Sequence, residues 1–372
     1  MDNHAAMQLA IACARSVEGR TSPRPPVGAV VVQDGTVVGT GATSPPYGPH
    51  AEVHALNAAG SAAYGADLYV TLEPCCITVH TPPCTDAIIQ AGIRRVFIAA
   101  LDPNPRVYQQ GVELLRQAGI EVFIEVEEVA TDIIRPFATL IKKGRPYVTA
   151  KWAMTLDGKI ATASGDARWI SGERSRLWVH QLRDRVDAIM VGAHTALVDD
   201  PQLTVRLPVE EQGLVRQPRS GPIRVVVSTN GELPSSLRLL QPDLASGTWV
   251  LVGETCMLTQ QQVLSSLGVT VIPVPLNEQG KVDIEVALST LAQRGIMHLL
   301  IEGGAQLLGS AFRQQVIDHV AVFIAPKILG DAAAPSPLIG SSVTWMQDAT
   351  RLHSIQSHLF DEDILLEGEF YH

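Results

Sequence analysis

Apolar residues recur in short blocks through the first 145 residues, and their spacing alternates between helical and strand-like periods. Residues 3–18 place Met7, Ala10, Ile11 and Ala14 at helical spacing, which predicts an amphipathic helix. The following blocks predict a β-hairpin with its turn at Asp34-Gly35, a helix that begins at His50, helices at 84–91, 111–118 and 128–141, and strands at 68–72, 96–101 and 120–126. Strands that alternate with helices in this way predict a mixed sheet covered by helices.

The segment 142–146 (KKGRP) is basic and turn-forming, and the alternation restarts after it. A chain of 372 residues is long for one domain, so we predict a boundary here, with domains at 1–145 and 146–372. In the second half we predict strands at 146–154, 187–192, 222–228, 248–253, 269–274, 297–302 and 319–326, helices at 172–184, 194–198, 283–293 and 304–314, and an exposed loop at 208–221.

Composition narrows the possible functions. The hydrophobic fraction of 46% is ample for two cores. The 38 acidic residues exceed the 28 basic ones and give a net charge of −10. This balance is poorly suited to a phosphate backbone, for which a basic surface supplies most of the affinity. We therefore expect a small-molecule substrate and no nucleic acid.

Cysteine usage and hydropathy bear on the compartment. Five cysteines, an odd number, favour a reducing environment over a disulfide framework. The first residues lack the basic segment of a secretory signal, and no run of about 18 apolar residues predicts a membrane span. These features predict a cytoplasmic protein with no membrane partner.

The clearest chemical pattern lies in residues 50–84. His50 and Glu52 open a predicted helix, Cys75 follows a predicted strand, and Cys84 begins the next predicted helix. One imidazole and two thiolates suit tetrahedral Zn²⁺ with the fourth position left for water. Glu52 is not needed as a ligand and can move protons to and from that water, as the corresponding Glu does in zinc nucleobase deaminases.

A structural zinc, or simple packing of the same side chains, is the alternative. A structural site needs four protein ligands, and Cys76 is a possible fourth thiolate, although adjacent cysteines rarely bind one ion. His54 lies one helical turn after His50 and is predicted to pack or to form a hydrogen bond. Cys13 and Cys256 lie in apolar runs and are predicted to be core thiols.

Three features of the second half suggest an anionic ligand. Gly303-Gly304 lie between a predicted strand and a predicted helix, where the backbone can approach a ligand and the helix N-terminus favours a phosphate. The polar loop 199–206 (DDPQLTVR) ends in Arg206, and Lys151 interrupts an apolar strand. A plain strand-to-helix turn, a surface loop and an edge-strand lysine are the respective alternatives.

Eight segments occur together in a characteristic order: HAEVHAL, YVTLEPC, TPPC, DPNP, KxAMxLDGKIA, DDPQLTVR, EGG and APKILG. Over essentially its whole length the chain resembles the bifunctional deaminase–reductases of riboflavin biosynthesis. The resemblance implies an α/β chain with a cytidine-deaminase-like mixed-sheet domain followed by a dihydrofolate-reductase-like domain. It also implies zinc-dependent deamination of a diaminopyrimidine ribosylamino 5′-phosphate, followed by NADPH-dependent reduction of the ribosyl group to ribityl.

The resemblance further assigns residues and partners. It implies His50, Cys75 and Cys84 as zinc ligands and Glu52 as the catalytic acid and base. The implied NADPH contacts are Ala153, Trp169, Thr195, Asp199, Ser228, Gly304, Ala305, Gln306, Leu307, Leu308, Gly309 and Ser310. The implied substrate contacts are Lys151, Ala167 (where Ser is common), Arg183, Leu203, Arg206 and Glu302. Members of the family commonly self-associate, so a homo-oligomer that binds a phosphorylated pyrimidine is expected.

The first domain departs from the family pattern. The family usually has a His and then Gly-Lys or Gly-Arg between the zinc cysteines, whereas residues 76–80 of this chain read CITVH. Arg24 replaces an Asn, Thr43 replaces a His, and 107–109 (VYQ) replace Val-Ala-Gly. His80 and Arg24 are candidates to replace the missing cation.

These departures leave competing hypotheses open. The chain would act as a reductase only if its first domain had drifted to another aminopyrimidine or to a structural role. A nucleic-acid-editing deaminase would need a basic groove with aromatic platforms, yet the chain is acidic and only 5% aromatic. A zinc-stabilised binding protein without activity would be supported if Glu52→Gln changed no measurable activity.

Overall fold

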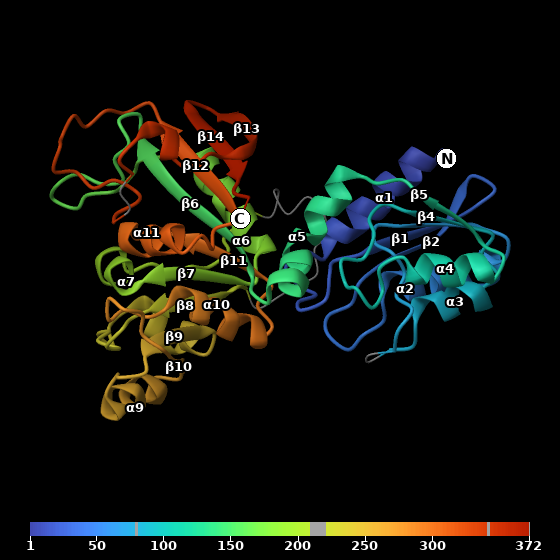
Figure 1. Ribbon diagram of the computed structural model, residues 1–372, viewed down its shortest axis with the longest axis horizontal. Helices are drawn as coiled ribbons and strands as arrows, with labels where there is room; N and C mark the ends of the chain where they lie inside the picture. Colours follow the sequence, from blue (N-terminus) through green and yellow to red (C-terminus); the bar gives the residue numbers. More distant parts are fainter. Residues whose placement is uncertain (79–80, 209–220, 341–342, 372) are drawn as a thin grey trace. The chain divides into compact units, whose positions relative to one another are not determined.

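The computed structural model describes residues 1–78, 81–208, 221–340 and 343–371 (Figure 1). The first of its two compact units comprises Met1–Gly144, and the second comprises Arg145–Pro208 and the described residues from Gly221 onward. Apart from its two end residues, the loop predicted at 208–221 lies outside the described residues. Among the described helices, none combines the length and apolar character needed to cross a bilayer.

The first unit is built on a five-stranded mixed sheet. The strands in sheet order are β2 (Thr36–Ala42), β1 (Gly28–Gln33), β3 (Asp67–Val70), β4 (Arg95–Ile98) and β5 (Glu121–Ile124). β1 is antiparallel to both of its neighbours, whereas β3, β4 and β5 are parallel. The predicted hairpin turn is confirmed, since Asp34 and Gly35 both have positive φ angles, 48° and 76°.

Five helices cover the two faces of this sheet: α1 (Asn3–Ser16), α2 (Ala51–Ala59), α3 (Cys84–Gln90), α4 (Gln110–Gln117) and α5 (Glu128–Lys143). α1 and α5 lie on one face, and α2, α3 and α4 lie on the other (Figure 1). Alternation along each strand explains the two layers, because Val30 and Tyr69 pack toward α1 while Val31 and Leu68 pack toward α2.

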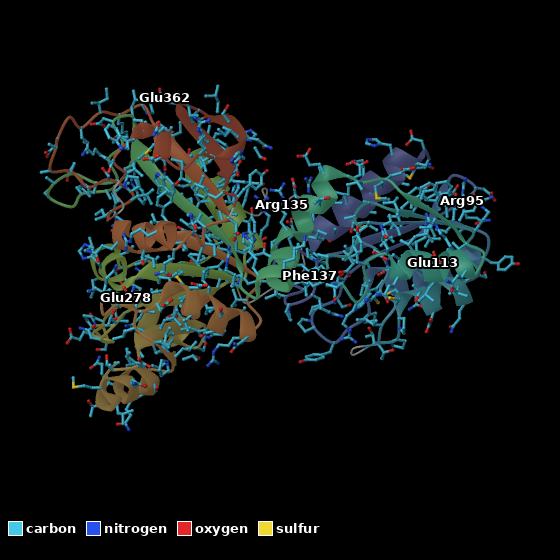
Figure 2. The ribbon with its side chains drawn as sticks, viewed as in Figure 1. Arg95, Glu113, Arg135, Phe137, Glu278 and Glu362 are labelled. Carbon is cyan, nitrogen blue, oxygen red and sulfur yellow. The ribbon has the colours of Figure 1, made fainter. Side chains whose placement is uncertain are left out.

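The amphipathic character of α5 illustrates how these layers form. Its Ala130 and Ile133 pack into the core that α1 also covers, whereas Arg135 pairs with Asp132 at 2.7 Å on a more exposed side of the helix (Figure 2). Such an apolar stripe beside charged positions is what places a helix on a sheet.

The second unit is built on a nine-stranded sheet. The strands in sheet order are β10 (Thr270–Val274), β9 (Thr248–Gly253), β8 (Ile223–Val227), β7 (Ala188–Gly192), β11 (His298–Glu302), β6 (Tyr147–Thr155), β12 (His319–Ala325), β14 (Asp363–Glu369) and β13 (His353–Phe360). The strands from β10 to β12 are parallel, and β14 and β13 are antiparallel.

Helices cover both faces of this sheet, as parallel strands require. They are α6 (Glu173–Arg185), α7 (Ala193–Asp199), α8 (Pro242–Ala245), α9 (Leu258–Ser266), α10 (Ile284–Gln293) and α11 (Ala305–Arg313). One core joins α10 and α11 to the sheet, and a second core joins α6, α7 and α9 to the opposite face.

The final strands, β13 and β14, were not predicted from the sequence, and β14 helps to position α6. Asp363 at the start of β14 is buried and accepts hydrogen bonds from the Gly172 N–H (2.7 Å) and the Ser175 hydroxyl (2.6 Å). The residue that precedes α6 is Gly172, which has no capping side chain of its own. Asp363 therefore caps α6 from a distant part of the chain, and α6 carries Arg183.

Candidate metal centre and cofactor cavity

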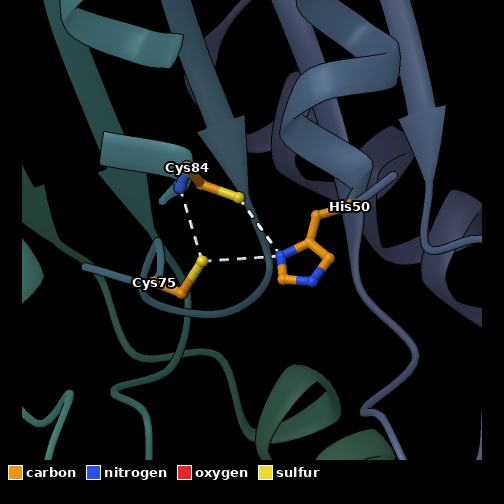
Figure 3. Close-up of side chains that lie close together, drawn as sticks. All are labelled: His50, Cys75 and Cys84. Atoms are coloured by element: carbon orange, nitrogen blue, oxygen red, sulfur yellow. Dashed lines mark hydrogen bonds between the residues drawn. The ribbon is translucent and has the colours of Figure 1, made fainter. Parts of the chain in front are cut away.

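The three predicted metal ligands come together from three segments of the first unit. His50 directly precedes α2, Cys75 lies in the loop after β3, and Cys84 begins α3. Nδ1 of His50 lies 3.2 Å from Sγ of Cys84 and 3.5 Å from Sγ of Cys75 (Figure 3). All three ligand atoms lie within 4.8 Å of one another. Gly41 on β2 permits this arrangement, since a Cβ there would lie only 2.2 Å from a backbone oxygen of α2.

The donor set fits zinc. In a tetrahedral site with Zn–N and Zn–S bonds of about 2.0 and 2.3 Å, the nitrogen and sulfur atoms lie about 3.5 Å apart. The observed separations of 3.2 and 3.5 Å are close to that value. Cys76 does not belong to the cluster, and its Sγ lies 3.9 Å from the carbonyl oxygen of Arg106. These residues therefore offer three ligands and leave a fourth position for water.

The two ligand cysteines share a hydrogen bond. This bond lowers the pKa of Cys75 to about 4 and raises the pKa of Cys84. Sγ of Cys75 also accepts the backbone N–H of Cys84 at 3.4 Å. The pair therefore favours one thiolate before a metal arrives, and metal binding must displace the remaining thiol proton.

Glu52 lies in the first turn of α2, beside the cluster, and is only 4% exposed. Burial raises the pKa of Glu52 to about 7, and the nearby Cys75 adds to this effect. A carboxyl group with a pKa near neutrality can both accept and donate a proton at pH 7.

Arg24, one candidate for the missing cation of the first domain, is held by the protein. Its guanidinium donates hydrogen bonds to three carbonyl oxygens of the loop 44–48. Arg24 therefore braces the segment that leads to His50. The other candidate, His80, lies outside the described residues. His54, predicted to pack or to form a hydrogen bond, has Nε2 2.7 Å from the hydroxyl of Ser44.

A cavity of about 810 Å³ lies near the carboxyl ends of β7 and β11 in the second unit. Parallel α/β sheets bind their ligands at these strand ends, and small-molecule sites commonly occupy about 300–1,000 Å³. The cavity brings together these predicted residues: Lys151, Ala153, Ala167, Trp169, Arg183, Thr195, Asp199, Leu203, Arg206, Glu302, Gly304 and Leu308.

Six residues assigned to the cofactor by resemblance do not line this cavity: Ser228, Ala305, Gln306, Leu307, Gly309 and Ser310. Ser228 follows β8 and is 2% exposed, and Leu307 is part of the core under α11. A cofactor role for these six residues stays a prediction.

A charged cluster forms one wall of the cavity. Glu302 and Lys151 are paired neighbours on the parallel strands β11 and β6. Glu302 accepts two hydrogen bonds from Arg183, at 2.6 and 2.8 Å. Although burial opposes the effect, Arg183 holds the pKa of Glu302 below its usual value, while burial lowers the pKa of Lys151. Arg183 also donates to the carbonyl oxygen of Thr204 at 3.1 Å and thereby orients the loop that carries Arg206.

His180 and Arg176 also line the cavity and were not predicted from the sequence. Nδ1 of His180 accepts the backbone N–H of Arg206 at 3.1 Å, and burial lowers the pKa of His180 to about 4. Arg176 lies over the ring of Trp169, 4.6 Å from its centroid. Residues 176, 180 and 183 follow helical spacing on α6, so the polar face of this predicted helix was the sequence feature that could have indicated them.

The turn between β11 and α11 presents backbone to the cavity. Gly303 and Gly304 have φ angles of 77° and 82°, and a Cβ on Gly304 would lie 2.9 Å from the hydroxyl oxygen of Thr195. Glycine is the residue that adopts this conformation without strain. The turn leaves the N-terminus of α11 beside the cavity, which suits an anionic ligand group.

Comparisons with known proteins follow the same division. Residues 1–100 match the cytidine and deoxycytidylate deaminase zinc-binding region, and residues 146–366 match the RibD C-terminal domain. The riboflavin biosynthesis protein RibD of Aquifex aeolicus is 40% identical over 362 residues, which cover 97% of this chain and 96% of that protein.

Two solved structures resemble the chain over its whole length. Acinetobacter baumannii RibD (form 1) has a TM-score of 0.85 at 33% identity, with 99% of this chain and 98% of that chain covered. A Thermotoga maritima diaminohydroxyphosphoribosylaminopyrimidine deaminase/5-amino-6-(5-phosphoribosylamino)uracil reductase has a TM-score of 0.82 at 34% identity, with the same coverage.

The fold and the two matched regions define an enzyme in which a cytidine-deaminase-like domain precedes a dihydrofolate-reductase-like domain. The chain belongs to the RibD family, the bifunctional deaminase–reductases of riboflavin biosynthesis. The sequence-based predictions of fold class and of bifunctional activity are thereby confirmed.

We expect purified protein to bind one zinc ion and Cys75→Ser to lower the zinc affinity by at least about tenfold, because a hydroxyl is a poor replacement for a thiolate ligand. The affinity is measured by competition with a chromophoric chelator. Cys76→Ser is the matched control and is expected to leave the affinity unchanged. Equal effects of the two substitutions would contradict the ligand set.

Proposed function

We propose that residues 1–145 are the deaminase domain, with His50, Cys75 and Cys84 as zinc ligands and Glu52 as the catalytic acid and base. The observation that carries this proposal is the convergence of the three ligand atoms beside a buried carboxyl group whose pKa is raised to about 7. By analogy with the T. maritima protein, the proposed substrate is 2,5-diamino-6-ribosylamino-4(3H)-pyrimidinone 5′-phosphate.

The deamination replaces an exocyclic amine of the ring by an oxygen atom from water. When bound, the zinc ion supplies a Lewis acid that makes water nucleophilic at neutral pH. Glu52 accepts a proton as the new C–O bond forms and donates it to the amine, which leaves as ammonia. Burial of Glu52 supports this role, since it brings the pKa close to the pH of the reaction.

We propose that residues 146–372 are the reductase domain and that NADPH is its cofactor. When bound, the reduced nicotinamide supplies a hydride, and the ribosyl group gains that hydride and a proton to become ribityl. The cavity offers the Gly303-Gly304 turn to a phosphate group of the cofactor. Lys151, beside Glu302 on the wall, is placed to orient the sugar by hydrogen bonding.

The full-length similarity to RibD proteins favours the bifunctional enzyme over a reductase whose first domain has lost deamination. The altered segment at 76–80 and the commitment of Arg24 to the loop 44–48 are the two features behind that alternative. The raised pKa of the buried Glu52 favours the active deaminase instead.

Self-association and a cytoplasmic location also stay predictions. β13 is an edge strand that exposes Ile355 and Leu359, at 60% and 75%, and an edge strand is a template for pairing with another chain. Light scattering would test self-association against the monomer mass of 39.9 kDa.

Glu52→Gln is expected to lower ammonia release from the diaminopyrimidine substrate by about 10²–10⁴-fold, because the amide cannot accept or donate the transferred proton. Ammonia release and NADPH oxidation are followed separately on the same purified protein. NADPH oxidation with the deaminated intermediate supplied directly is the internal control and is expected to stay unchanged. Ammonia release that persists in the variant would refute the role of Glu52.

Arg206→Gln is expected to raise KM for the deaminated phosphorylated intermediate by about 10–100-fold, because the substitution removes a charge-assisted hydrogen bond to the phosphate. KM for NADPH, and for the dephosphorylated intermediate, should change little. Arg174→Gln is the matched control on the exposed start of α6, where Arg174 pairs with Asp361 at 3.0 Å. An equal rise for the phosphorylated and dephosphorylated compounds would argue against phosphate binding by Arg206.

A further inference from the structure

Glu73 is a buried carboxylate that takes no part in the steps above. It is 2% exposed and is followed directly by Pro74 and Cys75. Its two oxygens accept four backbone N–H groups, from Gly111 (3.1 Å) and Val112 (3.3 Å) at Oε1 and from Gln109 (3.0 Å) and Asp102 (3.3 Å) at Oε2. An ionised carboxylate has about four acceptor sites, so these bonds saturate it.

The four donors come from two neighbouring segments, the loop 102–109 after β4 and the first turn of α4. The residue before α4, Gln109, lies in the left-handed region with φ 60° and provides no capping side chain. The free N–H groups at a helix start are costly to bury without an acceptor. Glu73 supplies that acceptor from the metal-binding loop and so joins α4 to this loop.

Contacts at the same place fix the peptide that leads to Cys75. A Cβ on Gly111 would lie 2.2 Å from the carbonyl oxygen of Pro74, so the first turn of α4 packs directly against this peptide. On the other side, the carbonyl oxygen of Cys75 accepts the N–H of Thr85 at 3.2 Å. The backbone of Cys75 is therefore held between α4 and the start of α3.

We propose that Glu73 is a positioning residue for the metal centre: by binding the backbone of α4 and of the loop 102–109, it sets the position of the thiolate of Cys75. The inference rests on the proposed assignment of Cys75 as a zinc ligand. Since metal geometry depends on the groups that orient the ligands, disturbing Glu73 should change the metal site even while the rest of the chain stays folded.

The test is Glu73→Gln in the full-length protein. Glutamine keeps one acceptor oxygen but turns an NH₂ group toward two of the four N–H donors, so that half of the bonds are lost. We expect the zinc affinity, measured against a chromophoric chelator, to fall by about 10–100-fold. In protein loaded with Co²⁺, we expect the visible d–d bands and the thiolate-to-metal charge-transfer band to shift.

Glu113→Gln is the matched control. Glu113 is an exposed carboxylate in the first turn of α4, the helix that Glu73 caps (Figure 2), and it accepts a hydrogen bond from the side chain of Gln117 at 3.0 Å. The substitution removes one negative charge at the start of the helix that Glu73 caps, without touching the metal-binding loop. It should leave both the zinc affinity and the cobalt spectrum unchanged.

The reductase step provides a second control, because its cavity lies in the other unit, and its rate should not change in either variant. If Glu73→Gln unfolds the first unit, a loss of far-ultraviolet ellipticity will show it. In that case Glu73→Asp tests the positioning role of Glu73. Aspartate keeps all four acceptor sites on a shorter side chain, so partial recovery of the affinity is expected, with a cobalt spectrum between those of wild type and Glu73→Gln.

An unchanged zinc affinity and cobalt spectrum in folded Glu73→Gln would overturn the proposal and leave Glu73 as a helix cap alone. In the unfolding case, a Glu73→Asp variant with the wild-type affinity and spectrum would overturn it as well. These readouts are independent of deamination. If the wild-type chain released no ammonia, the proposed function would fail while the metal measurements still decided the role of Glu73.

Discussion

The first unit depends on one constraint: two thiols and an imidazole must be held within bonding distance of a shared point before a metal is present. The ligands come from a residue before α2, a loop after β3 and the first residue of α3. Sulfur and nitrogen atoms separated by 3.2 and 3.5 Å satisfy this requirement. To hold these ligands, the fold packs α2 closely on β2 and α4 closely on the peptide before Cys75.

In both units, a buried carboxylate from a distant segment caps the start of a helix that bears on a site. In the first unit, Glu73 accepts backbone N–H groups at the start of α4, and in the second unit Asp363 does so at the start of α6. Each carboxylate is buried and comes from a segment outside the helix that it caps. Because α6 carries Arg183 and α4 packs beside Cys75, these distant caps connect the folding of the chain to the geometry of its sites.

Elements and site residues that depend on a local sequence pattern were predicted, whereas roles that depend on partners distant in the sequence were not. The five strands of the first sheet and the cluster of His50, Cys75 and Cys84 follow from periodicity and ligand spacing. β13 was missed because all but its last residue are exposed, so no apolar alternation marks it. α9 was missed because LTQQQVLSS is mostly polar. The role of Arg24 could not be read from its position, since its partners lie 20 or more residues away.

X-ray absorption at the zinc edge, on protein loaded with one equivalent of Zn²⁺, tests the central claim most directly. The account predicts a first shell of two sulfur atoms at about 2.3 Å and two nitrogen or oxygen atoms at about 2.0–2.1 Å, one of the latter from solvent. A shell of three or four sulfur atoms would mean that Cys76 joins a closed structural site. A shell without sulfur would mean that the cysteines do not bind the metal, and either result would contradict an open catalytic centre beside Glu52.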